Sequence, residues 1–300
     1  MIRRALLIGG LIAVLLPATA GGSAPNKFPE TTVNSGPPKV TTSGSATFTF
    51  TSSDPQAKFA CAIDQSAFSR CTSPLTYDGL PDGRHTFWVI SFGEEGSDPT
   101  PASWGWTIDR VPPSDVASPR AHVSYGHLDL TWRLSATSDA ARVLVMRSTN
   151  AKAAATRKVY DGSGESYSEA RFANGAYHKY KIQTIDLAGN VSPGIEVVVK
   201  PSALLLAPAD GATLGSVSGF RWRAVPHATF YNAQLFLGTH KVLSAWPLTP
   251  KLKLARHWSY GGRKHTLKPG LYTWYVWPGF GPRAKANYGA VIGQSSFRIR

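Results

Sequence analysis

The sequence predicts an all-β protein in which three tandem β-sandwiches follow a signal peptide. Apolar and polar residues alternate in many short segments, and 28 glycines and 22 prolines punctuate the chain between them. No heptad pattern and no long amphipathic helix is present. Short alternating segments at this spacing are typical of β-sandwiches and barrels. Because 42% of the 300 residues are hydrophobic, three units of roughly 90 residues can each bury a core.

The N-terminus has the organisation of a cleavable signal peptide. Two arginines near the start precede an apolar run at residues 5–16, and small residues lead up to Ala20, where signal peptidase would cleave. The run is too short to cross about 30 Å of hydrocarbon comfortably. We therefore expect residues 1–20 to be removed, leaving a secreted, extracellular or envelope-associated product without a membrane span. Residues 21–38 are polar and are expected to form a flexible leader.

Cys61 and Cys71 are the two cysteines of the chain and enclose nine residues. An oxidising compartment outside the cell would let them form a disulfide, and the alternative is a pair of buried free thiols. Two cysteines exclude a disulfide scaffold, a cysteine-cluster zinc domain and an iron–sulfur protein. The spacing of a redox-active Cys-x-x-Cys pair is also missing, so we expect a structural bond.

Alternating segments divide the rest of the chain into units at residues 39–112, 113–200 and 201–300. The apolar members of these segments are expected to point into three cores. In chain order they are Ala46, Phe48 and Phe50; Phe59, Cys61 and Ile63; Phe87 and Val89; Trp104, Trp106 and Ile108; Leu128, Leu130 and Trp132; Val143 and Val145; Tyr180 and Ile182; Ile195, Val197 and Val199; Phe220 and Trp222; Tyr231, Ala233 and Leu235; Leu252 and Leu254; Tyr272, Trp274 and Val276; Phe297 and Ile299. An Ala-rich stretch at 151–156 is the one segment expected to form a helical turn.

A weak repeat supports the division into three. Gly83, Gly175 and Gly270 each end a turn dipeptide just before an aromatic-rich strand. Glycine gives the backbone freedom that a tight turn requires, so each pair of features predicts a turn followed by a core strand. An aromatic residue at that position can also form the corner hydrogen bond found in immunoglobulin-like sandwiches.

The first unit contains a set of segments in a fixed order. These are Phe48-Thr49-Phe50-Thr51-Ser52-Ser53, Phe59-Ala60-Cys61, Cys71-Thr72-Ser73-Pro74-Leu75, Gly83-Arg84-His85-Thr86-Phe87 and Asp98-Pro99-Thr100-Pro101-Ala102. With these segments the unit resembles the bacterial Ig-like repeats of exported surface proteins. The resemblance covers most of residues 38–112. The segment at 91–96 of this unit differs from the Asp-x-Ala-Gly-Asn turn at 186–190 of the second unit. A role common to the two turns is therefore not inferred.

The second unit carries Trp132 and Ile185-Asp186-Leu187-Ala188-Gly189-Asn190, and the third carries Pro208-Ala209-Asp210-Gly211-Ala212 and Trp222-Arg223-Ala224-Val225-Pro226-His227-Ala228. Through these residues both units are similar, more loosely, to fibronectin type III modules. Modules of these families serve as spacers or binding platforms. The resemblance therefore implies a β-sandwich protein that is not an enzyme, and it names no ligand.

Positive charge is concentrated in the third unit. Residues 201–300 hold 13 Lys and Arg against a single acidic residue, Asp210, whereas residues 21–112 carry a net charge of −3. Alternation predicts that the cations flanking Trp222 and Leu252 point outward, and fibronectin-like strand order would place them on one face. These four binding candidates are Arg221, Arg223, Lys251 and Lys253. The alternative is that the cations only keep the sandwich soluble and protect its edges.

A second cluster mixes aromatic residues with cations before the last strand. It consists of Tyr275, Trp277, Phe280, Arg283, Lys285 and Tyr288. Exposed aromatic rings give flat stacking surfaces for sugars or bases, and neighbouring cations add affinity for anions. The alternative is that these rings pack against the second unit or are covered by loops.

Catalytic and metal-binding patterns are absent from the sequence. Glycoside hydrolysis usually requires two carboxyl groups, and neither a nucleophile elbow nor a phosphate loop is present. His122 and His127 are separated by a glycine-containing turn, which argues against a metal site. The stretch from Asp186 to Asn190 fits a calcium turn or a hairpin whose side chains cap the backbone, and we favour the hairpin. We predict no catalytic residue, cofactor or metal, and no enzymatic activity.

The sequence thus favours an exported adhesion-type surface protein whose third unit binds an acidic envelope polymer or polysaccharide. The first two units would act as spacer and projection. One alternative is a structural spacer or protein-interaction module, with another surface protein as its partner. A further alternative, extracellular nucleic-acid binding, shares the electrostatics but lacks a recognised reading motif.

Overall fold

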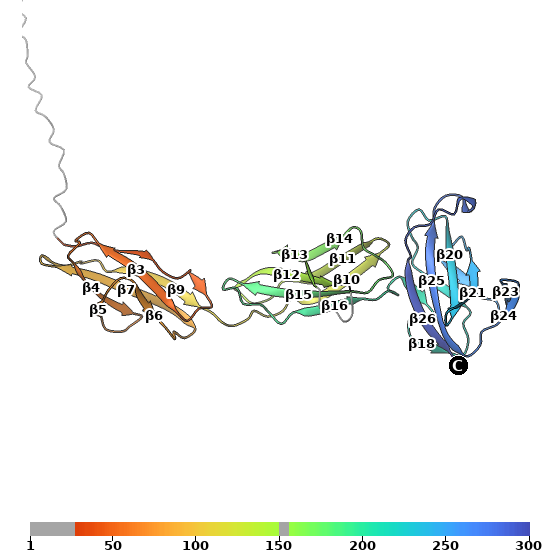
Figure 1. Ribbon diagram of the computed structural model, residues 1–300, viewed down its shortest axis with the longest axis horizontal. Coiled ribbons are helices and arrows are strands. Elements are labelled where there is room, and N and C mark those ends of the chain that lie inside the picture. Colours follow the sequence, from red (N-terminus) through yellow and green to blue (C-terminus); the bar gives the residue numbers. More distant parts are fainter. Residues whose placement is uncertain (1–27, 150–155) are drawn as a thin grey trace, which may run out of the picture. The chain divides into compact units, whose positions relative to one another are not determined.

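The computed structural model describes residues 28–149 and 156–300. These residues form β-strands arranged as three β-sandwiches in chain order, which confirms the predicted fold class (Figure 1). The chain separates into two compact units, one made of most of the first sandwich and the other of the second and third. The expected signal peptide lies outside the described residues, and so does the expected helical turn at 151–156 except for Thr156. No helix among the described residues is long and apolar enough to cross a membrane.

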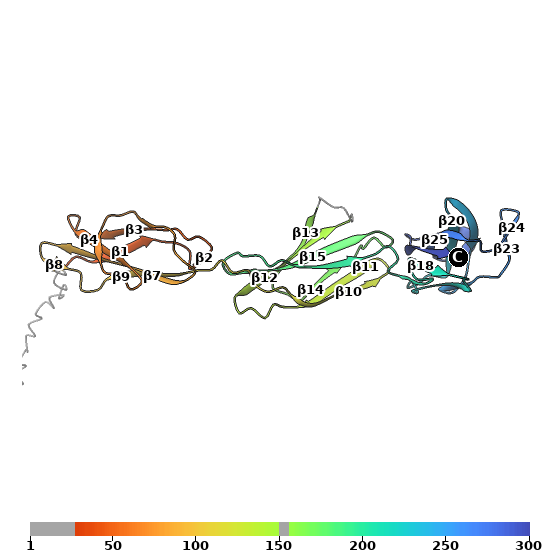
Figure 2. The same cartoon turned by 90° about the horizontal axis from the view of Figure 1, so that it is seen from below.

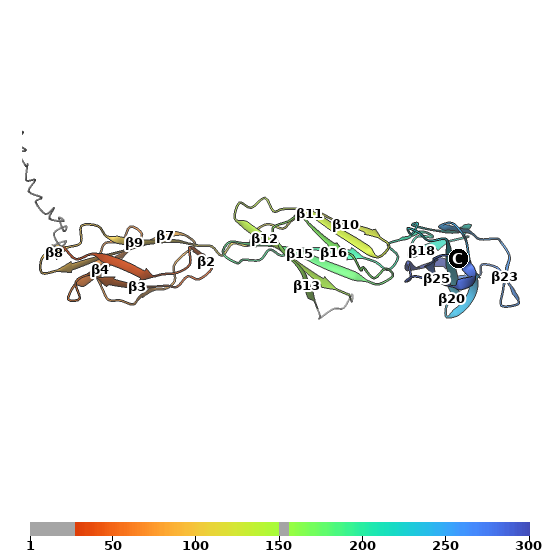
Figure 3. The same cartoon turned by 90° about the horizontal axis from the view of Figure 1, so that it is seen from above.

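The first sandwich has a three-stranded sheet, β1-β3-β6, and a larger sheet, β2-β9-β7-β4-β5, with β8 paired to β7. Figure 3 shows β3 on one side of this sandwich and β7 with β9 on the other. Between them Phe48 stacks on Phe87 with ring centroids 4.1 Å apart, and Trp106 contacts Phe48. The strands are β1 (Thr31–Ser35), β2 (Val40–Thr41), β3 (Ala46–Ser52), β4 (Lys58–Ile63), β5 (Ser69–Cys71), β6 (Leu75–Tyr77), β7 (Gly83–Gly93), β8 (Gly96–Ser97) and β9 (Ala102–Ile108).

Strand β1 corrects the predicted extent of the leader, because it lies within residues 21–38. It pairs antiparallel with β3, and the backbone N–H of Thr31 donates a hydrogen bond of 2.8 Å to the carboxylate of Asp98. Val33 is its one large apolar side chain. An edge strand this polar buries little surface, so alternation gave too weak a signal to detect it.

The two cysteines form the predicted disulfide, with their Cα atoms 5.8 Å apart. Cys61 belongs to β4 and Cys71 to β5, which are neighbouring strands at one edge of the larger sheet. The bond excludes the alternative of two free thiols. Its presence fits an oxidising compartment.

The second sandwich packs the sheet β10-β11-β14 against β13-β12-β15-β16. Figure 2 shows these layers, with β10 and β14 along one side and β13 and β15 along the other. Leu128, Trp132, Val145 and Tyr180 are buried between them. The strands are β10 (Ala117–Ser124), β11 (His127–Arg133), β12 (Ala140–Ser148), β13 (Arg157–Gly162), β14 (Ser166–Glu169), β15 (His178–Asp186) and β16 (Ile195–Val199).

The third sandwich packs the sheet β17-β19-β22 against the five-stranded sheet β18-β26-β25-β20-β21 and adds a β23-β24 hairpin. Phe220, Trp222, Trp274 and Phe297 are among its fully buried core residues. The strands are β17 (Leu205–Ala207), β18 (Ala212–Leu214), β19 (Gly219–Trp222), β20 (Phe230–Leu237), β21 (His240–Ala245), β22 (Lys251–Lys253), β23 (Trp258–Tyr260), β24 (Arg263–His265), β25 (Gly270–Gly279) and β26 (Gly293–Ile299). The single helical element of the described residues is the 3₁₀ turn η1 (Arg283–Lys285), which the sequence did not predict.

The three sandwiches share the order of their antiparallel strands, and the first and third have one more strand. In the first and third, a short strand at the edge of the larger sheet runs parallel to the last strand, as β2 does with β9 and β18 with β26. In all three, the two central strands of the larger sheet pair antiparallel, and the smaller sheet has three strands. This arrangement is that of immunoglobulin-like and fibronectin type III-like sandwiches.

The repeated turns have the expected backbone. The φ angles of Gly83, Gly175 and Gly270 are +132°, +76° and +149°, a region that favours glycine. In the third sandwich the strand after the turn also makes a corner hydrogen bond. The hydroxyl of Tyr272 accepts a 2.9 Å hydrogen bond from the backbone N–H of Lys268 and donates one of 3.1 Å to its carbonyl.

Candidate functional site

Four cations lie together on the outer face of the β17-β19-β22 sheet. Antiparallel pairing of β19 and β22 places Arg221 directly opposite Lys251. Lys253 follows two residues later on the same face of β22, and Arg223 comes just after the end of β19. All four side chains are exposed. We call Arg221, Arg223, Lys251 and Lys253 the basic strip.

No carboxylate neutralises the basic strip. Asp210 is the one acidic side chain of residues 201–300, and its Oδ1 accepts a 3.0 Å hydrogen bond from the backbone N–H of Ser296. No Lys or Arg in this fully described segment forms an ion pair. The strip therefore presents uncompensated positive charge to the solvent and to any ligand that approaches.

An open groove runs along the basic strip. Its lining combines three of the cations with small and hydroxyl-bearing residues and with two large apolar residues. These are Ala207, Ser218, Gly219, Phe220, Arg221, Thr249, Lys251, Leu252 and Lys253. An open groove of this kind suits an extended chain better than a small molecule that must be enclosed.

The predicted aromatic and basic cluster is divided by the structure. Tyr275 and Trp277 lie on β25 and point away from the core, with their rings stacked at 5.8 Å and both side chains half-buried. Phe280 packs against the third core and is not displayed as a stacking surface. Among the predicted binding residues, Phe280 is therefore half-buried rather than open, as in the alternative in which rings of this cluster are covered.

The loop between β25 and β26 carries the remaining members of the cluster. Arg283 and Lys285 are exposed in η1, and the side chain of Tyr288 is 38% exposed. The ring of Tyr288 lies edge-on to Phe230 at 5.5 Å. This loop contains η1 and lies at one end of the third sandwich in Figure 1.

The sequence analysis missed Trp246, which joins this cluster. Its side chain is 40% exposed, and its Nε1 donates a 2.7 Å hydrogen bond to the hydroxyl of Tyr288. The guanidinium of Arg283 lies over its ring, 5.6 Å from the centroid. Trp246 stands one residue beyond β21, whose Leu243 and Ala245 pair with the buried Leu235 and Ala233 of β20. Extending the alternation from these two residues would have placed Trp246 on the outer face.

The turn that follows β15 has the backbone-capping geometry favoured from the sequence. Asp186 Oδ1 accepts hydrogen bonds from the backbone N–H groups of Gly189 and Asn190, at 2.7 and 2.8 Å. The side-chain amide of Asn190 donates to Asp186 Oδ2 at 2.9 Å. These bonds hold the turn without any added ligand.

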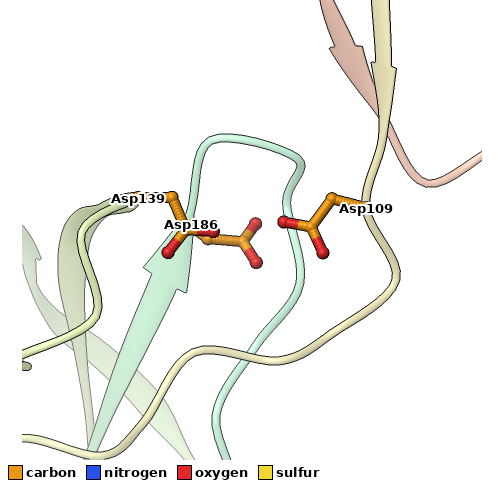
Figure 4. A group of neighbouring side chains, drawn as sticks. All are labelled: Asp109, Asp139 and Asp186. Atoms are coloured by element: carbon orange, nitrogen blue, oxygen red, sulfur yellow. The ribbon is translucent and has the colours of Figure 1, made fainter. Parts of the chain in front are cut away.

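The structure nevertheless brings two further carboxylates to Asp186, as Figure 4 shows. Asp109, Asp139 and Asp186 each place an oxygen within 4.8 Å of the other two, and Oδ1 of Asp139 is buried without a hydrogen-bond partner. Hard oxygen ligands of this kind are those that Ca²⁺ takes, so these three residues could hold such a cation. The prediction of no metal site did not foresee the cluster, because its members come from three segments far apart in the sequence, just after β9, just before β12 and at the end of β15.

Comparison with known proteins adds no family name. No protein-family model matches the chain, and no curated protein matches it. Among solved structures it is similar to a segment of two fibronectin type III domains from chicken tenascin, at 10% identity and a TM-score of 0.28, covering 57% of this chain and 97% of that one. It is similar to domains A168-A170 from titin at 14% identity and a TM-score of 0.39, covering 54% and 61%.

A third similar structure is the spore cortex lytic enzyme SleM of Clostridium perfringens. The identity is 16% and the TM-score 0.26, over 36% of this chain and 35% of that one. The chain thus spans about a third of that enzyme and less than two thirds of the titin segment. The assignment of the fold rests on the strand order of the structure itself.

Proposed function

We propose that the chain is an exported, non-enzymatic modular protein of the bacterial cell surface whose third sandwich binds an acidic envelope polymer through the basic strip. The observation that carries this proposal is the absence of any ion pair among the 13 cations of residues 201–300. The first two sandwiches act as spacers that project the third sandwich. Export is supported by the N-terminal signal pattern and by the disulfide.

The arrangement of the strip favours a polymer over a small anion. Its charges are spread along two neighbouring strands beside an open groove, so that successive acidic groups of one chain can each meet a cation. Single exposed ion pairs contribute only about 0.2–1 kcal/mol. Useful affinity therefore has to come from several contacts made at once by a repeating ligand.

Two other functions make different use of the same surface. In a structural spacer, or a module that binds another surface protein, the cations would only maintain solubility and keep the sheet edge from pairing. In a nucleic-acid-binding protein, the strip would contact phosphates. The one aromatic residue in the groove lining, Phe220, is 2% exposed and belongs to the core, so no ring is available to stack on bases, which favours a non-nucleic polyanion.

A salt titration separates these functions. The full chain is incubated with purified bacterial cell-wall fragments, with poly-L-glutamate and with single-stranded DNA, at NaCl concentrations from 25 mM to 500 mM. Screening weakens interactions between exposed charges, so retention on the wall and on poly-L-glutamate should fall steeply as salt increases. Absence of retention on wall fragments at the lowest salt would refute the proposal, and binding of DNA alone would favour the nucleic-acid function.

A further inference from the structure

The outer face of the five-stranded sheet in the third sandwich carries a second array of side chains, on the sheet opposite the basic strip. The register of β25 with its two neighbours sets the order. Tyr275 pairs with Gln294 of β26 on one side and with Gln234 of β20 on the other. Trp277, two residues along, pairs with Asn232 of β20. Aromatic and amide side chains therefore alternate across the strands.

Trp246 extends this array onto the edge of the sheet. Ala233 pairs with Ala245, and the next inter-strand hydrogen bond runs from the N–H of Tyr231 to the carbonyl of Pro247 at 2.9 Å. The register therefore places Trp246 beside Asn232, on the side away from Trp277. The two tryptophans flank one asparagine, with their Cα atoms about 10 Å apart across two strand spacings.

Hydrogen bonds fix these side chains before any ligand arrives. The amide of Asn232 is 5% exposed, donates to Ser244 Oγ at 3.2 Å and accepts from Gln234 Nε2 at 2.6 Å. Trp246 is held by its hydrogen bond to Tyr288. An aromatic surface that is already ordered loses little conformational entropy on binding.

Cations stand at both ends of this array. Arg283 lies over the ring of Trp246, and Lys241 lies 5.6 Å from the ring centroid of Phe236, two residues beyond Gln234 on β20. The only acidic side chain of this sandwich, Asp210, is engaged with the backbone of Ser296. The face thus combines flat apolar rings, amides and positive charge, which complements a chain of sugar rings that carries carboxylates. We call Trp246, Trp277, Tyr275, Tyr288, Arg283 and Lys241 the aromatic face.

We propose that the aromatic face binds an acidic polysaccharide, with its rings stacked on pyranose rings and Arg283 and Lys241 paired with uronic acid carboxylates. This inference rests on the proposed function for the acidic character of the polymer, adds a second contact surface on the sheet opposite the basic strip, and specifies the polymer class. A protein partner fits less well, because amides and hydroxyls are interleaved with the aromatic rings where the centre of a protein interface is apolar.

The test compares three polymers by affinity electrophoresis and isothermal titration of the full chain in 50 mM NaCl. Sodium alginate supplies pyranose rings and carboxylates, poly-L-glutamate supplies carboxylates alone, and hydroxyethylcellulose supplies rings alone. Alginate should bind at least about fivefold more tightly than poly-L-glutamate per carboxylate, because ring stacking adds to charge. Trp246→Ala should remove that difference. The matched control Trp88→Ala, at a side chain 36% exposed on β7 of the first sandwich, should keep it.

A second variant guards against a folding defect at Trp246. Arg283→Ala changes an exposed side chain in η1 and should weaken alginate binding while the melting temperature is unchanged. Equal binding of alginate and poly-L-glutamate, with neither affected by Trp246→Ala, would overturn this inference and leave the proposed function standing. Loss of binding to all three polymers and to cell-wall fragments would overturn both. Binding of single-stranded DNA that depends on Trp246, without binding of alginate, would overturn the polysaccharide assignment.

Discussion

Arg221 and Lys251 are direct cross-strand partners on β19 and β22, and both side chains are exposed. Like charges at opposing positions of a sheet destabilise it. The fold therefore contains a repulsion that a neutral residue at either position would remove. A loss of stability at this pair is expected if the two charges are kept for binding a ligand.

Neutralising one partner should separate stability from binding. We expect Lys251→Gln to raise the free energy of unfolding by about 0.3–1 kcal/mol and the melting temperature by about 2–5 °C, because the repulsion with Arg221 is lost. Retention on acidic polymer should fall in the same variant. The control is Lys264→Gln, which opposes Ser259 rather than a cation. Calorimetry that shows a lower melting temperature for Lys251→Gln would contradict this reading.

Asp98 should make the first sandwich sensitive to acid. Burial by itself raises the pKa of this carboxyl, but hydrogen bonds from Thr31 and Thr100 outweigh that effect and hold the pKa below its usual value. Since the folded pKa is lower than the unfolded one, the stabilisation is complete above about pH 4 and is lost as pH falls through the folded pKa. Denaturation followed between pH 7 and pH 2 measures this directly.

The matching substitution is Asp98→Ala, which leaves two backbone donors without an acceptor. We expect a loss of about 2–4 kcal/mol, confined to the first sandwich. Asp78→Asn changes an exposed carboxyl of the same sandwich and should alter stability by less than about 0.5 kcal/mol. A stability of Asp98→Ala equal to that of the control would show that the three hydrogen bonds contribute nothing.

The disulfide should stabilise the first sandwich selectively. Replacing Cys61 and Cys71 together with alanine should cost about 2–3 kcal/mol by the loop-entropy estimate. The unfolding of the second and third sandwiches should not change, because the bond joins two strands of the first one only. Differential scanning calorimetry resolves the two outcomes, and a shift of every transition would argue against a local effect.

The corner hydrogen bonds of Tyr272 predict a position-specific cost for the loss of a hydroxyl. Tyr272→Phe leaves the backbone of Lys268 without its partner, and we expect a loss of about 1–2 kcal/mol. Tyr275→Phe, on the same strand but facing outward, is the control and should be close to neutral. Urea denaturation of both variants compares them, and equal stabilities would refute the role of the corner.

Strand alternation predicted most of the fold, because large apolar side chains such as Trp132 and Trp274 mark the buried face of a strand without ambiguity. It failed where a strand buries little, as in β1, whose one large apolar residue is Val33. It also gave no warning of η1, whose short turn has no buried residue. Local pattern thus predicts elements in proportion to the apolar surface that they bury.

The candidate surfaces were only partly predictable for a different reason. The four members of the basic strip could be named from the sequence, because alternation predicts which side chains point outward and the fibronectin-like strand order predicts which strands are neighbours. Trp246 and the carboxylates around Asp186 depend on which distant segments meet, and no local pattern carries that information. Phe280 lies beyond the end of β25 and packs against the third core. Alternation does not predict the burial of a residue that lies outside a strand.

Charge reversal tests the central claim most directly. In 50 mM NaCl, the double variant Arg221→Glu with Lys251→Glu should bind purified cell-wall fragments about tenfold more weakly than the unmodified chain, because two attractive contacts become repulsive. Arg263→Glu with Lys264→Glu changes the net charge equally on the β23-β24 hairpin and should retain most of the binding. Equal binding by the two double variants would contradict the assignment of the ligand to the basic strip.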